Sequence, residues 1–502
     1  MSQKFQDTPT TNADAENEKE KHKGLLRKSI TLFLTLLVCI ILWCIPTANF
    51  DIPGLTIIQQ RVIVIFLFAI LMWLFNTIPA WATSVAIMTL LILTTSDNSL
   101  WLFEGPTNSQ AFGTVLSAKS IVATIADPIN ILFLGGFVLA LAATKSGLDV
   151  LLARTLLKPF GTKSENVLLG FILITGIFSM FISNTATAAM MLAFLTPVFK
   201  NLPSDGKGRV ALTMAIPIGA NIGGMGTPIG TPPNAIALKF LNDPNGLNLN
   251  IGFGEWMSFM LPFAIILLLI SWFIIRKLFP FKQKNIVLKI EGNTKKNYQT
   301  YIIYGTFAVT VLMWILDKYT GVSAGYVAMI PIFVLSATGV LTWKDLNELN
   351  WSVIWMMAGG FALGLALDKS GLAQTAIAAI PFGEWSPIIM LITSGLICYA
   401  LSNFISNTAT AALMVPIVAI VGKGMGGSLS AIGGEATLLI GIAIAASSAM
   451  ILPISTPPNA IADSTGMISQ KDMMRSGILV GIISMVIGYC MLYFLGVSHY
   501  IA

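Results

Sequence analysis

Histidine and charged residues are scarce in this chain of 502 residues. Only 10% of the residues are charged, and the two histidines, His22 and His499, lie near the two ends of the chain. Histidine-based metal sites and acid–base catalysts need several such groups close together, so we expect neither. The chain also lacks a glycine-rich phosphate loop ending in Lys and Ser or Thr, and it lacks a nucleophile elbow.

Cysteine is equally rare. Cys39, Cys44, Cys398 and Cys490 lie inside apolar segments without metal-ligand spacing, so the sequence predicts that they are buried as small hydrophobic residues. No small-residue cleavage pattern follows the first apolar run. We therefore interpret residues 1–28, which carry charges of both signs, as a retained disordered cytoplasmic tail and not as a signal peptide.

Apolar sequence, in contrast, is abundant. Hydrophobic residues make up 55% of the chain, and the mean hydropathy is +0.80, values typical of a polytopic membrane protein. At about 20 residues per crossing, the apolar runs predict an all-α fold of about 11 transmembrane helices and two re-entrant hairpins. The net charge is +6, and basic residues gather in the tail and between Arg276 and Lys296. That distribution indicates membrane topology, and we expect no nucleic-acid partner.

An eight-residue sequence, ISNTATAA, occurs twice without a change, at Ile182–Ala189 and at Ile405–Ala412. Three flanking landmarks recur in the same order at nearly the same spacing. They are GGF at Gly135–Phe137 and Gly359–Phe361, KSGL at Lys145–Leu148 and Lys369–Leu372, and TPPNAIA at Thr231–Ala237 and Thr456–Ala462. The chain therefore contains a duplicated unit of roughly a hundred residues.

The first half, residues 29–275, combines ordinary spans with two irregular segments. A re-entrant hairpin is predicted at about 166–200, because this stretch is too short for two crossings and SNT interrupts its middle. A crossing at about 209–242 is broken by adjacent prolines. The ordinary spans are expected near 29–48, 61–78, 80–96, 129–145 and 256–279.

The second half, residues 300–502, repeats this plan after a basic cytoplasmic loop at 276–299. A second hairpin is predicted at about 384–421, and a second broken crossing at about 435–465. The ordinary spans are expected near 300–316, 325–341, 351–367 and 472–497.

Basic residues assign a side of the membrane to each connection. We expect the N-terminus in the cytoplasm, residues 97–127 outside, and the basic stretch that begins at Lys145 inside. Counted from the N-terminus, six crossings in total bring the chain to the basic loop in the cytoplasm. The crossings that follow place the C-terminus outside the cell. Five crossings separate the two ISNTATAA copies, and because five is odd, the copies face opposite sides. The sequence thus predicts an inverted-topology repeat.

Broken helices at membrane depth persist only where they line a polar cavity or are buried in protein. SNT supplies hydroxyl and amide groups that cap helices, and helix N-termini attract anions. Carbonyls freed at the opposite helix ends, together with Ser and Asn oxygens, suit sodium ions. Because Gly224 in the first copy corresponds to Ala449 in the second, two such cation sites would be similar but unequal.

Five further residues in the repeats each have two interpretations. Thr231 and Thr456 either contact a ligand or only cap the helix that follows the proline pair. Lys145 and Lys369 are better interpreted as interfacial side chains at helix ends than as substrate ligands. Asp463 either affects ion coupling or is a solvated charge at a helix end.

The paired SNT and TPPNAIA motifs resemble those of the divalent anion:sodium symporter family of dicarboxylate, citrate and sulfate transporters. The resemblance extends over nearly everything except the N-terminal tail. It implies a homodimer of eleven-span subunits, each with a scaffold domain and a transport domain that moves as an elevator. The implied substrate-binding residues are Ser183, Asn184, Thr185, Ser406, Asn407 and Thr408, with Thr231 and Thr456 as further candidates. The implied sodium ligands are Ser179, Ser183, Asn184 and the Gly224 carbonyl, and Ser402, Asn407 and the Ala449 carbonyl.

The expected function is secondary active transport of a small dicarboxylate, such as succinate, malate, fumarate or 2-oxoglutarate, across the plasma membrane. No cofactor is expected other than Na⁺ as a coupling ion. Sodium symport and dicarboxylate exchange both fit, because intact SNT motifs do not separate them. Sulfate and citrate are alternative substrates. A membrane-embedded enzyme would need clustered catalytic groups, and a channel would need a continuous pore, so both are weaker interpretations.

Overall fold

The computed structural model describes residues 12–50, 52–105, 109–199, 202, 206–244, 246–286 and 297–500. Over these ranges the protein is helical, with two isolated β-bridges and no strand, which confirms the predicted all-α fold. Helices α1 to α11 are Asn12–Cys44, Ile57–Phe75, Ala80–Thr95, Ala118–Ala123, Pro128–Ser146, Leu148–Leu157, Ser164–Ser179, Asn184–Phe199, Lys207–Gly224, Pro232–Leu241 and Phe253–Leu278. Helices α12 to α23 are Tyr298–Ile315, Asp317–Thr320, Ala324–Val327, Met329–Ala337, Trp343–Leu346, Trp351–Lys369, Leu372–Ala379, Pro387–Ser402, Asn407–Met425, Glu435–Ser447, Pro457–Ser464 and Gln470–Val497.

Seven helical stretches in the described ranges are long and apolar enough to cross a membrane. They are Gly24–Cys44, Ile57–Phe75, Ala118–Ser146, Phe253–Leu278, Trp351–Lys369, Asn407–Ile432 and Gln470–Val497. Shorter apolar helices include Ala80–Thr95, Ala324–Ala337 and both helices of the first predicted hairpin. The chain is thus a multi-pass membrane protein, and eleven crossings stay a prediction that needs some of the shorter helices to cross as well.

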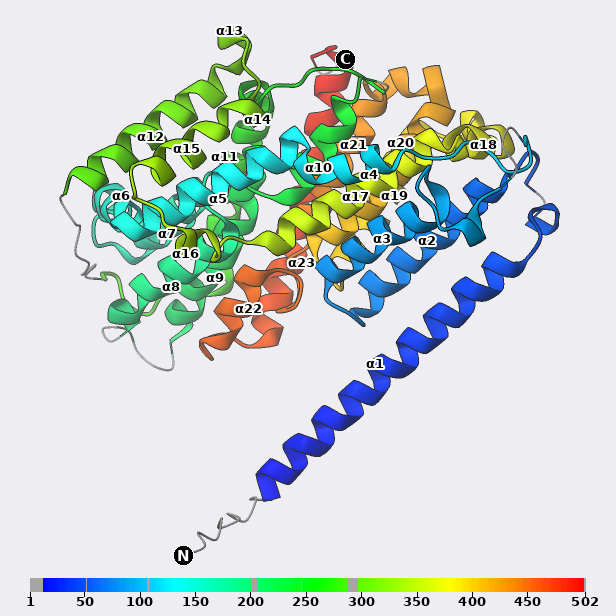
Figure 1. Ribbon diagram of the computed structural model, residues 1–502. Helices are drawn as coiled ribbons and strands as arrows, with labels where there is room; N and C mark the ends of the chain where they lie inside the picture. Colours follow the sequence, from blue (N-terminus) through cyan, green and yellow to red (C-terminus); the bar gives the residue numbers. More distant parts are fainter. Residues whose placement is uncertain are drawn as a thin grey trace, which may run out of the picture.

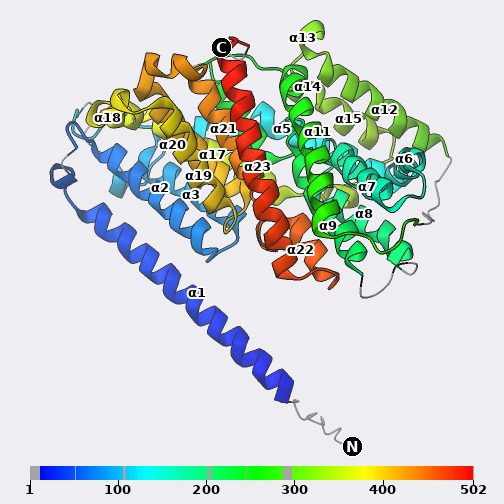
Figure 2. The same cartoon turned by 180° about the vertical axis from the view of Figure 1, so that it is seen from behind.

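Helix α1 differs from the sequence-based expectation. The sequence predicts a disordered tail over residues 1–28, but the helix begins at Asn12 and continues to Cys44. Ala, Glu and Lys, which dominate residues 13–23, have high intrinsic helix propensity, and an adjoining apolar span offers a helix to extend. In both views α1 extends away from the rest of the bundle, with only its C-terminal part near α2 (Figures 1 and 2).

The repeated KSGL sequence forms the same turn in both halves. Gly147 follows α5 with φ of 71°, and Gly371 precedes α18 with φ of 76°. Both angles lie in the left-handed region, where glycine has no β-carbon to clash. The duplicated glycines therefore end one helix and start the next, at the α5–α6 and α17–α18 junctions.

The helices that carry the repeated motifs pack across the two halves of the chain. Helix α10, from the first half, packs against α20 and α21, whereas α22, from the second half, packs against α8 and α9. Helices α11 and α23 lie side by side (Figure 2). The two halves are therefore interlocked, and each broken helix reaches the hairpin of the other half.

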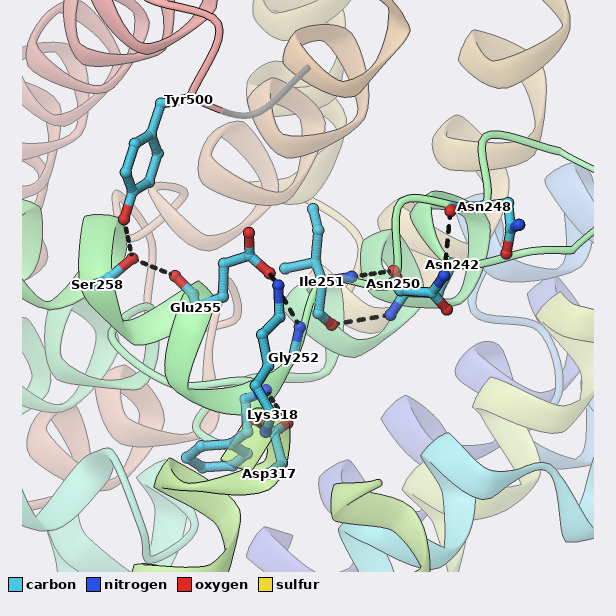
Figure 3. Close-up of polar contacts among 11 residues, drawn as sticks. Asn242, Asn248, Asn250, Ile251, Gly252, Glu255, Ser258, Asp317, Lys318 and Tyr500 are labelled. Atoms are coloured by element: carbon cyan, nitrogen blue, oxygen red, sulfur yellow. Dashed lines mark hydrogen bonds and ion pairs between the residues drawn. The ribbon is translucent and has the colours of Figure 1, made fainter. Parts of the chain in front are cut away.

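A polar cluster connects α11 to the beginning of the second half (Figure 3). The Asp317 carboxylate accepts a hydrogen bond of 2.6 Å from the backbone N–H of Phe253, in the first turn of α11. Lys318 and Glu255 form an ion pair of 2.5 Å. The carboxylate at a helix N-terminus also complements the helix dipole, so this cluster holds α11 against the end of α12.

The cysteines are only partly buried, in contrast to the expectation that all four would be. Cys39 and Cys398 are buried, whereas Cys44 and Cys490 are exposed on helix surfaces. A lipid-facing helix surface needs no burial to be free of water, so membrane spans accommodate an exposed thiol beside exposed apolar side chains.

Candidate binding site at the hairpin tips and helix breaks

The two ISNTATAA copies form tips of the same construction. The first tip joins α7 to α8 through Met180–Ser183, and the second joins α19 to α20 through Asn403–Ser406. The Ser183 hydroxyl accepts a hydrogen bond of 3.3 Å from the Ala186 N–H. Ser406 does the same for Ala409, also at 3.3 Å. Each serine thus caps the helix that starts at the next residue, the asparagine of SNT.

Three of the predicted cation ligands in the first half lie together. The Ser179 hydroxyl donates to Asn184 Oδ1 at 2.5 Å, across the turn. A β-carbon built on Gly224 would lie 2.8 Å from the same Asn184 Oδ1 and 2.8 Å from the Gly230 carbonyl oxygen. The tip asparagine is therefore in close contact with the break between α9 and α10, and a glycine is required for that approach.

The second half brings Ser402 and Asn407 together in the equivalent way. Ser402 Oγ lies 2.8 Å from Asn407 Oδ1 and 2.9 Å from the Ala446 carbonyl oxygen. The bond from Ser402 to the break thus goes to Ala446 and not to Ala449, which lies about one helical turn further along. The two clusters are similar in plan and differ in detail.

Asparagines of the TPPNAIA motif hold the breaks, a role that the sequence analysis did not assign. Asn234 Nδ2 donates to the carbonyl oxygens of Gly224, Met225 and Thr227 at distances of 3.2, 3.1 and 2.8 Å. Asn459 Nδ2 donates in the second half to Met450 and Leu452. These bonds satisfy carbonyls that the interrupted helices leave free. The repetition of Asn within TPPNAIA was the signal that could have revealed them.

The two breaks are also anchored to their own hairpin tips, by different residues. Thr227 Oγ1 donates to the Met180 carbonyl in the first tip. In the second, Asn403 Oδ1 accepts from the Ile451 N–H at 2.9 Å, and Ser455 Oγ donates to the Asn403 carbonyl at 3.1 Å. Each tip and its break therefore form one hydrogen-bonded unit.

Thr456 and Thr231 behave differently. Thr456 Oγ1 accepts a hydrogen bond from the Asn459 N–H at 3.3 Å and thereby caps α22. Thr231 stands at the same place before α10, and its side chain makes no capping hydrogen bond. Both residues are buried. Capping thus accounts for Thr456 and does not account for Thr231.

Helix ends dominate the electrostatics of these units. Helices α8 and α20 begin at the tips, and α7 and α19 end there. The broken helices likewise end at Gly224 and Ser447. N-termini present partial positive charge to an anion, and C-terminal carbonyls present oxygen ligands to a cation. None of the predicted binding residues ionises, so both kinds of ligand would be met by dipoles.

The two lysines of the KSGL repeats make ion pairs. Lys145 Nζ lies 2.7 Å from Asp345 Oδ2 and 3.1 Å from the Val340 carbonyl oxygen. Lys369 lies 3.2 Å from Asp368. These contacts agree with the interpretation of both lysines as helix-end residues.

A cavity of about 370 Å³ lies away from the tips. It is lined by residues of six α-helices and the loops beside them, and the lining includes an ion pair of 2.7 Å between Lys239 and Asp127. Its lining contains none of the predicted substrate or cation ligands. In the described residues no hydrogen bond joins the first tip directly to the second; they are connected through the broken helices.

Comparisons with known proteins agree with the repeated motifs. The citrate transporter family (CitMHS) matches residues 70–433. The sodium-dependent dicarboxylate transporter SdcS of Staphylococcus saprophyticus is 31% identical over 419 residues, which cover 76% of this chain and 79% of that protein. SdcS of Staphylococcus aureus is 30% identical over 459 residues, which cover 84% and 83%.

An uncharacterized transporter of Haemophilus influenzae is 32% identical over 418 residues, which cover 77% of this chain and 87% of that one. Two solved structures share the fold at low identity. Neisseria gonorrhoeae MtrF has a TM-score of 0.51 at 13% identity, with 84% of this chain and 96% of that chain covered. Alcanivorax borkumensis YdaH has a TM-score of 0.52 at 12% identity, with 83% and 98% covered.

Proposed function

Because this chain belongs to the divalent anion:sodium symporter family of membrane transporters, we propose that it carries a small dicarboxylate into the cell together with sodium ions. Succinate, malate, fumarate and 2-oxoglutarate are the candidate substrates. Relatives that cover most of this chain are named sodium-dependent dicarboxylate transporters, and this favours symport over exchange.

The observation that carries the proposal is the paired Ser–Asn construction at the two tips. In each half a serine hydroxyl bonds the Oδ1 of the first residue of a helix, Asn184 or Asn407. The oxygens of such a pair, with carbonyls at the adjacent break, provide uncharged ligands for Na⁺. The backbone N–H groups at the same helix start provide donors for a carboxylate. Two such tips match a substrate with two carboxylates.

The absence of basic side chains in the motifs bears on the mechanism. Neither ISNTATAA nor TPPNAIA contains Lys or Arg, so an isolated dianion would be only partly compensated by helix dipoles. Sodium ions bound beside the tips would supply the missing positive charge. Substrate affinity would then require sodium, and this is the physical basis of coupling in the proposal.

The remaining parts of the proposal concern the whole transporter. The N-terminus lies in the cytoplasm and the C-terminus outside, and the subunits form a homodimer. The two hairpins and two broken helices, interlocked across the halves, form a transport domain that moves as an elevator against a scaffold of the other helices. Citrate is the second candidate substrate, favoured by the citrate transporter family that matches residues 70–433, and sulfate is the remaining alternative.

The test is uptake of labelled succinate into proteoliposomes that contain the purified protein. With an inward sodium gradient and no internal dicarboxylate, we expect accumulation, and with choline in place of sodium we expect none. Asn184→Ala and Asn407→Ala each remove the Oδ1 that the serine contacts, and we expect a loss of uptake of at least about 100-fold, because both charge compensation and positioning fail.

The matched control is Asn350→Ala, which changes an exposed asparagine before α17 that makes no capping bond and should keep normal uptake. If uptake is driven only by internal dicarboxylate, the mechanism is exchange and not symport. If the protein takes up citrate or sulfate and does not take up succinate, that anion replaces the small dicarboxylate as the proposed substrate. Near-normal uptake by both tip variants would contradict the site.

A further inference from the structure

Among the buried positions next to the breaks that differ between the halves is Asn221 in α9, whose counterpart is Ala446 in α21. The two positions correspond at the same spacing as Thr231 and Thr456. Asn221 Nδ2 lies 3.2 Å from Thr456 Oγ1 and 3.2 Å from Asn459 Oδ1. Asn459 Nδ2 is in turn bonded to two carbonyls of its break. Both ends of the Asn459 amide are therefore satisfied, and the Oδ1 end relies on Asn221.

Asn234 is the counterpart of Asn459 in the first half, and its Oδ1 has no such donor. Its Nδ2 faces three carbonyl oxygens, which fixes the orientation of the amide, because the flipped form would place Oδ1 against those carbonyls. Oδ1 therefore points away from the break. The side chain is 0% exposed, and Oδ1 has no partner within the described residues.

The packing indicates what this oxygen faces. Helix α10 packs against α21 as α22 packs against α9, so the residue that corresponds to Asn221 opposite Asn234 is Ala446. Ala446 is fully buried, and its methyl group cannot donate a hydrogen bond. The next residue, Ser447, has a buried hydroxyl that also lacks a partner in the described part of the chain. Buried polar atoms are rarely left unpaired in native proteins.

We propose that a water molecule or a sodium ion binds between Asn234 Oδ1 and α21. This position is equivalent to the one that the Asn221 amide occupies beside Asn459 Oδ1. A water would donate a hydrogen bond to Oδ1 and a sodium ion would be coordinated by it, and the Ser447 hydroxyl offers a second oxygen. Asn234 Oδ1 and the Ser447 hydroxyl are not among the sodium ligands expected beside Asn184 and Asn407. If the ligand is sodium, the proposal rests on the sodium coupling proposed above and adds one ion to it.

The first experiment replaces the ligand with a side chain. Ala446→Asn copies Asn221 of the first half into the equivalent position of the second half and places an amide donor opposite Asn234 Oδ1, whereas Ala446→Leu adds similar bulk without a donor. Thermal unfolding of the purified variants is measured in detergent without substrate. We expect the melting temperature of Ala446→Asn to equal that of the unchanged protein or to lie about 2 °C above it, because the new amide supplies the missing hydrogen bond. The melting temperature of Ala446→Leu should be lower than that of the unchanged protein.

A reciprocal variant tests the same interpretation in the second half. Asn221→Ala removes the donor from Asn459 Oδ1 and should lower the melting temperature. Equal destabilisation by Ala446→Asn and Ala446→Leu would overturn the proposal. These measurements need no transport, so their failure would concern this site, whereas uptake by the unchanged protein without sodium would contradict the proposed coupling.

The second experiment separates the two ligands. The number of sodium ions moved with each substrate is obtained from the reversal potential in proteoliposomes. A number lower by one in Ala446→Asn identifies a sodium ion. An unchanged number, together with a water resolved beside Asn234 Oδ1 in the unchanged protein and displaced in Ala446→Asn, identifies a water. An unchanged number with no density at this position in a high-resolution map overturns the proposal.

Discussion

At the scale of single residues, each hairpin tip depends on a serine and an asparagine five positions apart. Ser179 contacts Asn184, and Ser402 contacts Asn407. The serine lies at the end of one short helix and the asparagine at the start of the next. The pair therefore joins a carbonyl-rich helix end to an N–H-rich one, an arrangement that fits the proposed binding of a cation and an anion within a few residues of each other.

Gly224→Ala should disturb one tip and leave the other intact. The new β-carbon would lie 2.8 Å from Asn184 Oδ1 and from the Gly230 carbonyl, so either the break or the asparagine must shift. We expect the sodium concentration that gives half-maximal succinate uptake to rise at least about 10-fold, with little loss of folded protein. Sodium titration of uptake in proteoliposomes measures this shift.

The control for that substitution is Gly305→Ala, because a β-carbon on Gly305 meets no atom within 4 Å. It should leave the sodium titration unchanged. An unchanged titration in Gly224→Ala as well would remove Gly224 from the cation site. Ala449, the counterpart of Gly224, already carries the methyl group, so Ala449→Gly should have a much smaller effect.

Sequence repetition revealed some of these residues and concealed others. The recurrence of SNT predicts the tip serines and asparagines, whereas Ser179 and Ser402 are implied only by the family resemblance. The structure places these two serines against the tip asparagines. Asn221 was missed because it is a mismatch between the halves, with Ala446 as its counterpart. A search for identity between repeats cannot find a residue whose role comes from being present only once.

At the scale of helices, α5 and α16 are joined by the ion pair between Lys145 and Asp345. Lys145 lies in the last turn of α5, where positive charge complements the helix dipole. Asp345 also accepts hydrogen bonds of 2.6 Å from the Thr342 N–H and hydroxyl, in a capping box at the start of α16. The side chain thus caps one helix and pairs with the end of another.

This pair predicts an acid-dependent loss of stability. The Lys145 ammonium, followed by the Thr342 hydroxyl and N–H, lowers the pKa of Asp345 from 3.8 to about 2. A lowered carboxyl pKa stabilises the folded state above the ordinary carboxyl range, and that contribution is lost as the pH falls from about 4 to about 2. Because Lys145 is 42% exposed, solvent screening limits the contribution to about 0.5–1 kcal/mol.

Thermal unfolding of the unchanged protein and of Asp345→Asn measures the contribution. The difference between their melting temperatures should be present at pH 6 and should shrink toward zero near pH 2. Salt should weaken it at pH 6, since the pair is partly exposed. Two proteins that melt together at pH 6 would show that the pair does not stabilise the fold.

Helix boundaries show where a hydropathy pattern is sufficient to locate a helix and where it is not. The span expected at 80–96 is α3, Ala80–Thr95, because Pro79 and Ser96 delimit an uninterrupted apolar run. The span expected at 325–341 is instead two short helices, Ala324–Val327 and Met329–Ala337. Pro331 lies in the first turn of the second one, and hydropathy averaged over a window does not register such an interruption.

At the scale of the whole molecule, the predicted inverted repeat would explain why the halves interlock. If the two hairpins enter the membrane from opposite sides, their tips meet near its middle, and each broken helix continues past its own tip to the hairpin of the other half. The packing of α10 on α20 and of α22 on α8 has this exchanged form. A direct repeat, with both hairpins on one side, gives no reason for the exchange.

The same topology predicts which side of the membrane each hairpin base occupies. Thr162 precedes the first hairpin and Glu384 precedes the second, and both are exposed. In a variant without the four native cysteines, Thr162→Cys should react with a membrane-impermeant maleimide only after the membrane is opened, whereas Glu384→Cys should react in intact cells. Ser498→Cys, near the C-terminus, serves as the outside reference. Labelling of both hairpin bases from one side would contradict the inverted repeat. It would also contradict the placement of the two tips as halves of one site, because tips that enter the membrane from the same side share an orientation and cannot approach a substrate from opposite directions.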